Sequence, residues 1–141
     1  MAEKAAKACA DDIYQRLRSA GLRPTRQRLA LAELLFARGH RHLTAESLHA
    51  DATRAGIGVS LATVYNTLHQ FTAAGILRQV AVDAARTYFD TNVDPHQHFY
   101  AEDSGALIDI PGETIAVSGL PLAPKGMMID RVDVVVRIRK A

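Results

Sequence analysis

The apolar residues between Ser60 and Leu77 recur with the period of an α-helix. They are three or four residues apart, which places them on one stripe of a helix. These positions are Leu61, Val64, Leu68 and Phe71. Ser60 is a favoured N-cap residue because its hydroxyl can accept a hydrogen bond from a backbone N–H of the first turn. Gly75 is a typical stop signal. The pattern therefore predicts a capped helix over Leu61–Ala73 that buries one face.

A second helix is expected just upstream, because Leu43, Thr44 and Glu46 resemble a helix start. It would run to about Ala55, and the glycine-containing residues 56–59 would form a turn before the capped helix. Helix, short turn and second helix make a helix-turn-helix, in which the second helix enters a DNA groove. For this segment taken alone, the alternative is an ordinary surface helix with polar residues on its exposed face.

The residues that follow the capped helix favour the DNA-binding interpretation. Two alternating stretches, Ile76–Val82 and Arg86–Thr91, predict a β-hairpin with its turn at residues 83–85. Such a hairpin is the wing of a winged helix. Upstream, the apolar pattern of TRQRLALAELLFARG predicts one more amphipathic helix that begins near Pro24.

The chain of 141 residues is long enough for one average domain or two small ones. We expect a mixed α/β (α+β) protein with three parts. These are a winged-helix DNA-binding domain over residues 1–91, a hinge at 92–95 and a small α/β dimerisation domain over 96–141. We expect residues 1–10 to be a mobile segment that precedes a helix from Asp11 to Ser19. No apolar run has the length of a membrane span and the N-terminus lacks a signal-peptide core, which predicts a cytoplasmic protein with no membrane partner.

Charge is distributed unevenly along the chain. Residues 1–90 hold twelve Lys or Arg against eight Asp or Glu, a net of +4, whereas residues 91–141 hold five against seven, a net of −2. Five arginines cluster between Arg16 and Arg28. A solvated face is the ordinary explanation of such a cluster, but beside a predicted recognition helix it favours neutralisation of DNA phosphates.

The last third of the chain predicts three strands, in HQHFY, ALIDI and the long run MMIDRVDVVVRIRK, with a short helical or irregular stretch near Glu113–Ser118. About 50 residues bury too little surface to be stable alone. Val132, Val134, Val136 and Ile138 alternate along the last strand, so one apolar face needs a cover. We therefore expect a homodimer formed by residues 96–141.

Histidines mark a candidate metal or haem site. His96 and His98 are two residues apart in a strand, so both imidazoles project from the same face and form half a site for a divalent metal or haem iron. His42 and Asp90 are further candidates, and a site that joined all four residues would span the hinge. An exposed pair without a ligand is the alternative for His96 and His98. We expect structural or solvent-facing positions for the other three histidines, His40, His49 and His69.

At these positions the chain resembles the Fur (ferric uptake regulator) family of bacterial metal-responsive repressors. The similarity lies in RHLTAESL, in SLATVYNTLHQFTAAGILRQV and in TYFD followed by HQH. The chain is most similar to the Irr (iron response regulator) branch. That similarity lies in GLRPTRQRLALAELLF, TYFDTNVDPHQHFY, ALIDIP and VVVRIRK.

The resemblance implies roles for particular residues. The helix Leu61–Ala73 would dock in the major groove, where Tyr65 and Thr63 reach thymine methyl groups or base edges. Ser60 and Asn66 would contact the backbone or bases, and Arg23 would lie near phosphates or enter an A/T-rich minor groove. Fur proteins commonly carry arginine where this chain has Asn66, and asparagine suits adenine rather than guanine. The regulatory metal site of the family would consist of His42, Asp90, His96 and His98.

Three departures from the family pattern change the expected cofactors. Ala101 and Ser104 stand where Fur proteins usually place a Cys-x-x-Cys pair, so we expect no structural zinc. Pro95 and Gln97 occupy positions of a second sensor site, and neither suits that role. Cys9, the one cysteine, is followed by alanine rather than by the proline of the haem motif of some Irr proteins, so His96 and His98 are the better candidates for haem or metal.

By resemblance to Irr, the protein would bind A/T-rich operator DNA when iron is scarce and be released by haem, which a partner protein would deliver. The alternative is a Fur-type repressor activated by Fe²⁺ or Mn²⁺ at the same four residues. A small metalloenzyme is a third possibility, because His96, His98 and Glu102 faintly resemble cupin ligands. It is disfavoured because cupins need many more strands, and we expect no enzyme activity.

Overall fold

The computed structural model describes residues 2–141, apart from the side chains of residues 2–9 and of Glu113. The chain divides into two compact units, Met1–Val93 and Asp94–Ala141. We call them the winged-helix unit and the C-terminal unit. The division falls within the segment predicted to be a hinge, and its action as a hinge stays a prediction.

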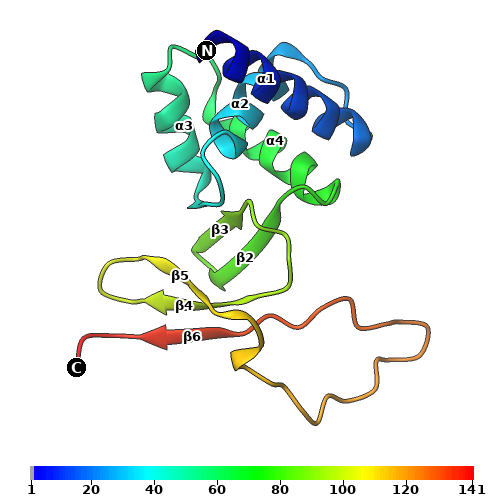
Figure 1. Cartoon of the computed structure of the whole chain (residues 1–141). Coiled ribbons are helices and arrows are strands. Elements are labelled where there is room, and N and C mark those ends of the chain that lie inside the picture. Colours follow the sequence, from blue (N-terminus) through cyan, green and yellow to red (C-terminus); the bar gives the residue numbers. More distant parts are fainter. Residues whose placement is uncertain (1) are drawn as a thin grey trace. The chain divides into compact units, whose positions relative to one another are not determined.

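The winged-helix unit contains four helices and a small sheet (Figure 1). Its elements are α1 (Ala2–Ser19), α2 (Arg26–Phe36), β1 (His42–Leu43), α3 (Ala45–Arg54), α4 (Leu61–Ala73), β2 (Arg78–Asp83) and β3 (Arg86–Asp90). The helix-turn-helix of α3 and α4 and the wing of β2 and β3 are therefore confirmed as elements of the fold.

The ends of α4 follow from its sequence. The Ser60 hydroxyl accepts a hydrogen bond of 3.1 Å from the Thr63 N–H and so caps the first turn. At the other end Gly75 has a φ of +81°, a left-handed conformation that glycine adopts without steric cost. The Ile76 N–H then reaches the Phe71 carbonyl at 3.1 Å, which satisfies an otherwise unpaired carbonyl of the last turn. The predicted start and stop of this helix are confirmed.

One continuous core holds the helices of this unit together. Its largest members are Leu17, Leu31, Leu35, Leu48, Leu68, Phe71 and Phe89. The predicted apolar stripe of α4 is buried at Val64, Leu68 and Phe71, but Leu61 is 36% exposed. Leu61 lies in the first turn of α4, and the core begins one turn further along the helix. The expectation that Leu61 faces inward is therefore wrong.

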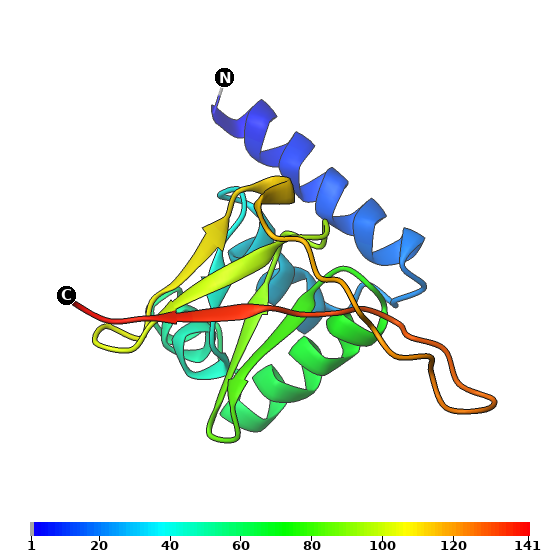
Figure 2. The ribbon, with the colours of Figure 1, turned by 90° about the horizontal axis from the view of Figure 1, so that it is seen from below.

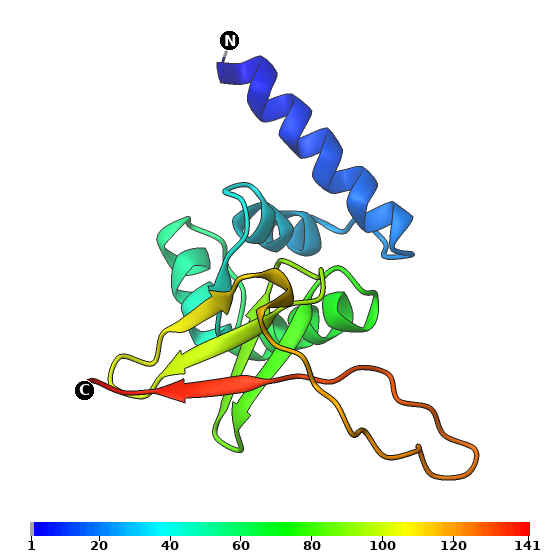
Figure 3. The same cartoon turned by 60° about the horizontal axis from the view of Figure 1, so that its bottom comes forward.

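The first helix is longer than predicted. It begins at Ala2, so the stretch expected to be a mobile lead-in is part of α1. Alanine and lysine, which dominate this stretch, have high helix propensity, which explains the earlier start. The C-terminal half attaches the helix to the unit, because Ile13 and Leu17 are buried. Figure 3 shows α1 as one straight helix that extends beyond the rest of its unit at its N-terminal end.

The sheet of this unit has the order β1-β3-β2 and is antiparallel. The hairpin strands match the predicted wing within two residues at either end, and the Asp83 carboxylate accepts a hydrogen bond from the Ala85 N–H in the turn. The two-residue strand β1 was not predicted, because a pair of residues carries no periodic signal. It pairs His42 with Asp90 and Leu43 with Phe89.

The C-terminal unit consists of β4 (Gln97–Ala101), β5 (Leu107–Ile110), the 3₁₀ turn η1 (Gly112–Thr114) and β6 (Val135–Ile138). The sheet order is β5-β4-β6, with β4 antiparallel to β5 and parallel to β6. Between η1 and β6, residues 115–134 have no regular structure and form a long excursion from the sheet, drawn in orange in Figure 2.

The last strand is shorter than its sequence pattern suggested. It begins at Val135, although the alternating residues start several positions earlier. Its neighbour β4 begins at Gln97, and just before β6 the Val134 carbonyl still accepts a 3.3 Å bond from the His98 N–H of that strand. The Gln97 side chain adds a second contact at Val134, because its amide oxygen accepts a 2.6 Å bond from the Val134 N–H. Across residues 2–141, no helix combines the length and the apolar character needed to cross a membrane.

Candidate functional site

The predicted DNA-reading residues lie on the side of α4 that faces away from the core. Tyr65 and Asn66 are exposed and Thr63 is half-buried. The Ser60 hydroxyl is already engaged at the N-cap, where it also contacts the Thr63 hydroxyl at 3.0 Å. The structure therefore brings Ser60, Thr63, Tyr65 and Asn66 together on the first two turns of one helix. Their contacts with DNA stay a prediction.

Tyr65 is held by a neighbour on α3. Its hydroxyl donates a 2.6 Å hydrogen bond to Oε1 of Glu46. This bond lowers the pKa of Glu46 and raises the pKa of the Tyr65 hydroxyl, since it stabilises the charged carboxylate and the neutral phenol. Sequence reasoning used Glu46 only as a helix-start signal and missed this contact, which depends on how α3 packs on α4.

Arg23 lies outside the helices and is exposed. Its backbone is tied to the recognition helix by Arg28, which sequence reasoning placed only within an arginine cluster. The Arg28 guanidinium donates to the Arg23 carbonyl at 3.0 Å and to the Gln70 side-chain oxygen at 2.9 Å. Arg28 therefore connects the segment that carries Arg23 to α4.

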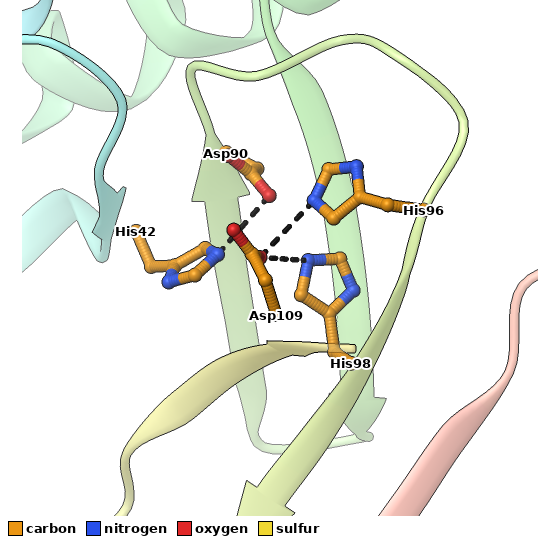
Figure 4. Close-up of side chains that lie close together, drawn as sticks. All are labelled: His42, Asp90, His96, His98 and Asp109. Atoms are coloured by element: carbon orange, nitrogen blue, oxygen red, sulfur yellow. Dashed lines mark ion pairs between the residues drawn. The ribbon is translucent and has the colours of Figure 1, made fainter. Parts of the chain in front are cut away.

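His42 and Asp90 form the first pair of candidate metal ligands. They face each other across the β1–β3 ladder, with His42 Nε2 at 3.1 Å from Asp90 Oδ2 (Figure 4). The other carboxylate oxygen of Asp90 accepts a 2.9 Å bond from the Asn92 N–H, which fixes the carboxylate plane. Beside the pair, the Arg41 N–H donates to the Thr91 hydroxyl at 2.8 Å, so the register is held next to the ligands.

The C-terminal unit provides the second group of candidate ligands. His96 Nε2 lies 3.2 Å and His98 Nε2 lies 3.4 Å from the same oxygen of Asp109, and Figure 4 shows both rings turned toward that carboxylate. The two rings are 4.5 Å apart between centroids. On β5, Asp109 is the registered partner of His98, which explains why the acid meets the pair.

The tautomer of His96 follows from its second nitrogen. Nδ1 lies 2.6 Å from the Asp94 carbonyl oxygen. A carbonyl only accepts hydrogen bonds, so Nδ1 carries a proton, and Nε2, which faces the Asp109 carboxylate, can bind a metal when it carries none. This second contact orients the imidazole in the way that metal-binding histidines are usually oriented.

Asp109 was missed by sequence reasoning. The available signal was a single acidic residue within the apolar strand ALIDI, which follows the His-x-His pair. That signal is weak, because the acid meets the histidines only through the β4–β5 register. Together these residues offer imidazole nitrogens and carboxylate oxygens and no thiolate, a donor set that suits Fe²⁺, Mn²⁺ or Zn²⁺. The ligand atoms of His96, His98 and Asp109 all lie within 4.8 Å of one another.

The positions expected to lack structural zinc lie at the end of β4 and in the turn after it. Ala101 offers no ligand, and the turn is closed by hydrogen bonds instead. The Gly105 N–H reaches the Ala101 carbonyl at 2.8 Å, and the Ala106 N–H reaches the Ser104 hydroxyl at 3.3 Å. The absence of structural zinc stays a prediction.

A winged helix joined to a small sheet unit, with histidine and aspartate candidate ligands in both, is typical of one class of protein: the metal-responsive DNA-binding transcription regulators. The model of the "Ferric uptake regulator family" matches residues 19–136. The chain belongs to the ferric uptake regulator family. Members are DNA-binding regulators rather than enzymes, so the enzyme alternative is excluded and the predicted fold class is confirmed.

Two characterised relatives show the range of signals in this family. The ferric uptake regulation protein of Pseudomonas aeruginosa is 35% identical over 94 residues, which are 66% of this chain and 70% of that protein. The peroxide-responsive repressor PerR of Staphylococcus aureus is 33% identical over 93 residues, which are 66% of this chain and 62% of that protein. Neither relative belongs by name to the Irr branch, so that finer assignment stays a proposal.

Solved structures support the same fold. The ferric uptake regulator of Pseudomonas aeruginosa with manganese matches with a TM-score of 0.67 and 27% identity, over 89% of this chain and 96% of that one. The Vibrio cholerae ferric uptake regulator matches with a TM-score of 0.68 and 23% identity, over 90% of this chain and 98% of that one. The second similarity concerns the fold alone.

Proposed function

We propose that the chain is a Fur-type repressor whose binding to operator DNA is activated by Fe²⁺ or Mn²⁺. One observation carries this proposal: Nε2 atoms of His96 and His98 converge on a single oxygen of Asp109, at 3.2 and 3.4 Å. Such convergence is what a divalent cation with nitrogen and oxygen ligands requires. The related Pseudomonas regulator was solved with manganese, which supports the choice of metal.

We extend the ligand set across the two units. His42 and Asp90 form an aligned pair in the winged-helix unit, and His96, His98 and Asp109 form the group in the C-terminal unit. A divalent cation held by these residues would supply the positive charge that their carboxylates lack. Ligands from both units would restrict the orientation of the winged helix and favour the DNA-binding arrangement over others.

For DNA recognition we propose the residues given by the sequence. Tyr65 and Thr63 would meet thymine methyl groups or base edges in the major groove, Asn66 would read adenine and Ser60 would contact the backbone. Arg23 would approach the phosphates or the minor groove of an A/T-rich site. The exposure of Tyr65, Asn66 and Arg23 supports these roles.

We further propose a homodimer formed by residues 96–141. A two-fold pair would present two α4 helices about 34 Å apart, one turn of DNA. The exposed apolar side chains of the C-terminal unit support a covering partner, and Leu122, Met127 and Met128 are the most exposed of them. We expect the protein to act in the cytoplasm, where operator DNA is found.

A second candidate is the haem response of Irr, in which haem releases the protein from DNA and a partner protein delivers the haem. The similarity of residues 21–36 and 87–100 to Irr favours it. The site geometry favours it less, because both Nε2 atoms point to the same carboxylate oxygen. If both histidines were axial ligands of one haem, the two imidazoles would have to lie on opposite faces of the porphyrin ring.

Operator binding under four conditions separates the candidates. A/T-rich duplexes are selected from a random library with the metal-loaded protein, and affinity is then measured with no metal, Mn²⁺, Fe²⁺ or haem. We expect Mn²⁺ and Fe²⁺ to raise affinity, and His96→Ala to weaken the metal effect roughly 10–100-fold or more, since it removes a direct ligand. His40→Ala is the control, because His40 is an exposed histidine outside the ligand groups.

The same measurements contain the outcomes that contradict each candidate. Loss of DNA binding on addition of haem, with no effect of Mn²⁺ or Fe²⁺, would favour the haem response and reject the metal-activated repressor. Equal affinity under all four conditions would reject both.

A further inference from the structure

The Tyr65 hydroxyl has a partner on the protein, so it is not simply an exposed group waiting for DNA. It donates a 2.6 Å hydrogen bond to the Glu46 carboxylate, a short bond of the charge-assisted kind, which is stronger than a bond between neutral groups. Glu46 is exposed and lies in the first turn of α3. A carboxylate at a helix N-terminus is stabilised by the helix dipole, so the acceptor stays charged.

The aromatic ring of Tyr65 also has a neighbour. His69, one turn later on α4, stacks against it with centroids 6.4 Å apart and an angle of 21° between the planes. His69 in turn meets the buried Phe89 ring edge-on at 5.9 Å. The Tyr65 side chain is therefore held at its hydroxyl by α3 and along its ring by a residue that packs on the core.

This arrangement decides which part of Tyr65 is available to DNA. The hydroxyl is committed to Glu46, whereas the ring, on a side chain that is 36% exposed, lies on the surface of the recognition helix. An aromatic ring has no strong donor or acceptor, and its natural partner in the major groove is the thymine methyl group. A side chain held before binding also loses less conformational entropy on binding.

We propose that Glu46 is a positioning residue for base recognition: its carboxylate fixes the Tyr65 ring against a thymine methyl group, and the Tyr65 hydroxyl makes no contact with DNA. The inference rests on the proposed function of α4 as the reading helix. Glu46 does not touch DNA in this role. Its negative charge also lowers affinity for phosphates of any sequence, so the residue increases specificity at some cost in total affinity.

Uracil-substituted DNA tests the proposal, because uracil lacks only the methyl group of thymine. Each thymine of the selected duplex is replaced in turn, in the presence of Mn²⁺, to find the position where wild type discriminates and Tyr65→Ala does not. Burial of one methyl group predicts about fourfold discrimination by wild type there. Glu46→Gln should keep it, because the amide oxygen still accepts the hydrogen bond.

Two variants break the same bond from its two ends. Glu46→Ala removes the acceptor and Tyr65→Phe removes the donor, and both should reduce the discrimination close to onefold. Their combination should add nothing further. Glu46→Gln and Glu46→Ala remove the same charge, so any gain in affinity for random DNA should be equal in the two. Glu33→Ala, an exposed glutamate on α2, is the control and should leave discrimination unchanged.

Several outcomes would overturn the inference. If Glu46→Ala and Glu46→Gln discriminate thymine equally, Glu46 does not position Tyr65 and acts only as a surface charge. If the variant that combines Glu46→Ala with Tyr65→Phe lost more thymine discrimination than either single variant, the Tyr65 hydroxyl would contact DNA directly. If the duplex is bound and Tyr65→Ala changes discrimination at none of its thymines, this inference is wrong. The proposal of a metal-activated repressor would be unaffected. If no duplex is bound with Mn²⁺ or Fe²⁺, the proposed function fails first.

Discussion

The two units of the chain differ in how completely they bury their own apolar side chains. The winged-helix unit closes a core that extends from Ile13 to Phe89 through every helix. In the C-terminal unit, the buried apolar side chains among those the structure describes are Tyr100, Leu107 and Ile110. The same unit leaves Leu122 96% exposed and Met128 85% exposed.

This difference follows from size and secondary structure. Four helices with apolar stripes can enclose a core, whereas a three-stranded sheet of about 50 residues has too little material to cover both of its faces. The winged-helix unit therefore has a core of its own that can stabilise it. The C-terminal unit is better suited to gain stability from what it binds, whether a metal ion or a second copy.

The largest change in stability is expected from a substitution in the core of the winged-helix unit. Phe71→Ala should destabilise the winged-helix unit by about 3–5 kcal/mol, because Phe71 is fully buried and its removal leaves a cavity. Urea denaturation followed by circular dichroism measures the change. Met128→Ala is the comparison variant and should shift stability by less than about 0.5 kcal/mol in the monomer. Equal effects of the two variants would contradict the contrast between the units.

The next effect concerns the exposed apolar residues of the C-terminal unit. If a second copy covers them, Leu122→Glu should weaken dimerisation by about 1.5–3 kcal/mol per copy, the value of burying one leucine. Sedimentation equilibrium over a range of concentrations measures it. Leu61→Glu, an exposed leucine of the winged-helix unit, should leave association unchanged. Unchanged association of the Leu122 variant would remove this surface from the proposed interface.

A smaller effect is expected at the start of the recognition helix. Ser60→Ala should cost about 1 kcal/mol of stability, because the Thr63 N–H loses its hydrogen-bond acceptor. Thermal unfolding measures the loss, and Ser118→Ala in the irregular segment is the control. A loss of operator affinity much larger than the loss of stability would support a direct backbone contact by Ser60.

The smallest effect is expected from a surface ion pair of the winged-helix unit. Burial tends to raise the pKa of Asp51, but hydrogen bonds from Arg41 and Arg54 outweigh it and hold this pKa below its ordinary value. The carboxylate therefore contributes stability above its unfolded-state pKa of about 3.9, and this contribution disappears as the pH falls through the lower folded-state value.

Asp51→Asn should accordingly lower stability at neutral pH by about 0–1 kcal/mol, as for ion pairs near the surface, because the Arg41 and Asp51 side chains are only half-buried. The variant and wild type should converge in acid. Urea denaturation at pH 7 and at pH 2–3 compares them, and a difference that grows on acidification would contradict the assignment.

Much of the winged-helix fold could be predicted from the sequence because its signals are local. Ser60 and Gly75 set the ends of α4 through their own backbone preferences, and alternation along residues 76–91 set the wing. The failures involved residues whose environment lies elsewhere. Leu61 fits the apolar stripe, yet its side chain is 36% exposed, and β6 begins only where it pairs with β4.

The candidate sites divide in the same way. His96 and His98 stand out because a spacing of two puts them on one face of a strand, and the resemblance to Fur proteins pointed to His42 and Asp90. Asp109 and Glu46 carried no comparable signal. Each is separated in sequence from the residue it contacts, and the contact exists only because two elements pack together.

The sequence by itself therefore determined the elements, the predicted recognition helix and most of the candidate ligand residues, since these depend on periodicity, capping and residue type over a few positions. Only the tertiary structure decided which side chains meet. It placed His42 opposite Asp90, Asp109 between two histidines and Glu46 on Tyr65. Strand register and helix packing fix such contacts, because hydrogen bonds and ion pairs need their atoms within about 3–4 Å, a precision that no sequence pattern contains.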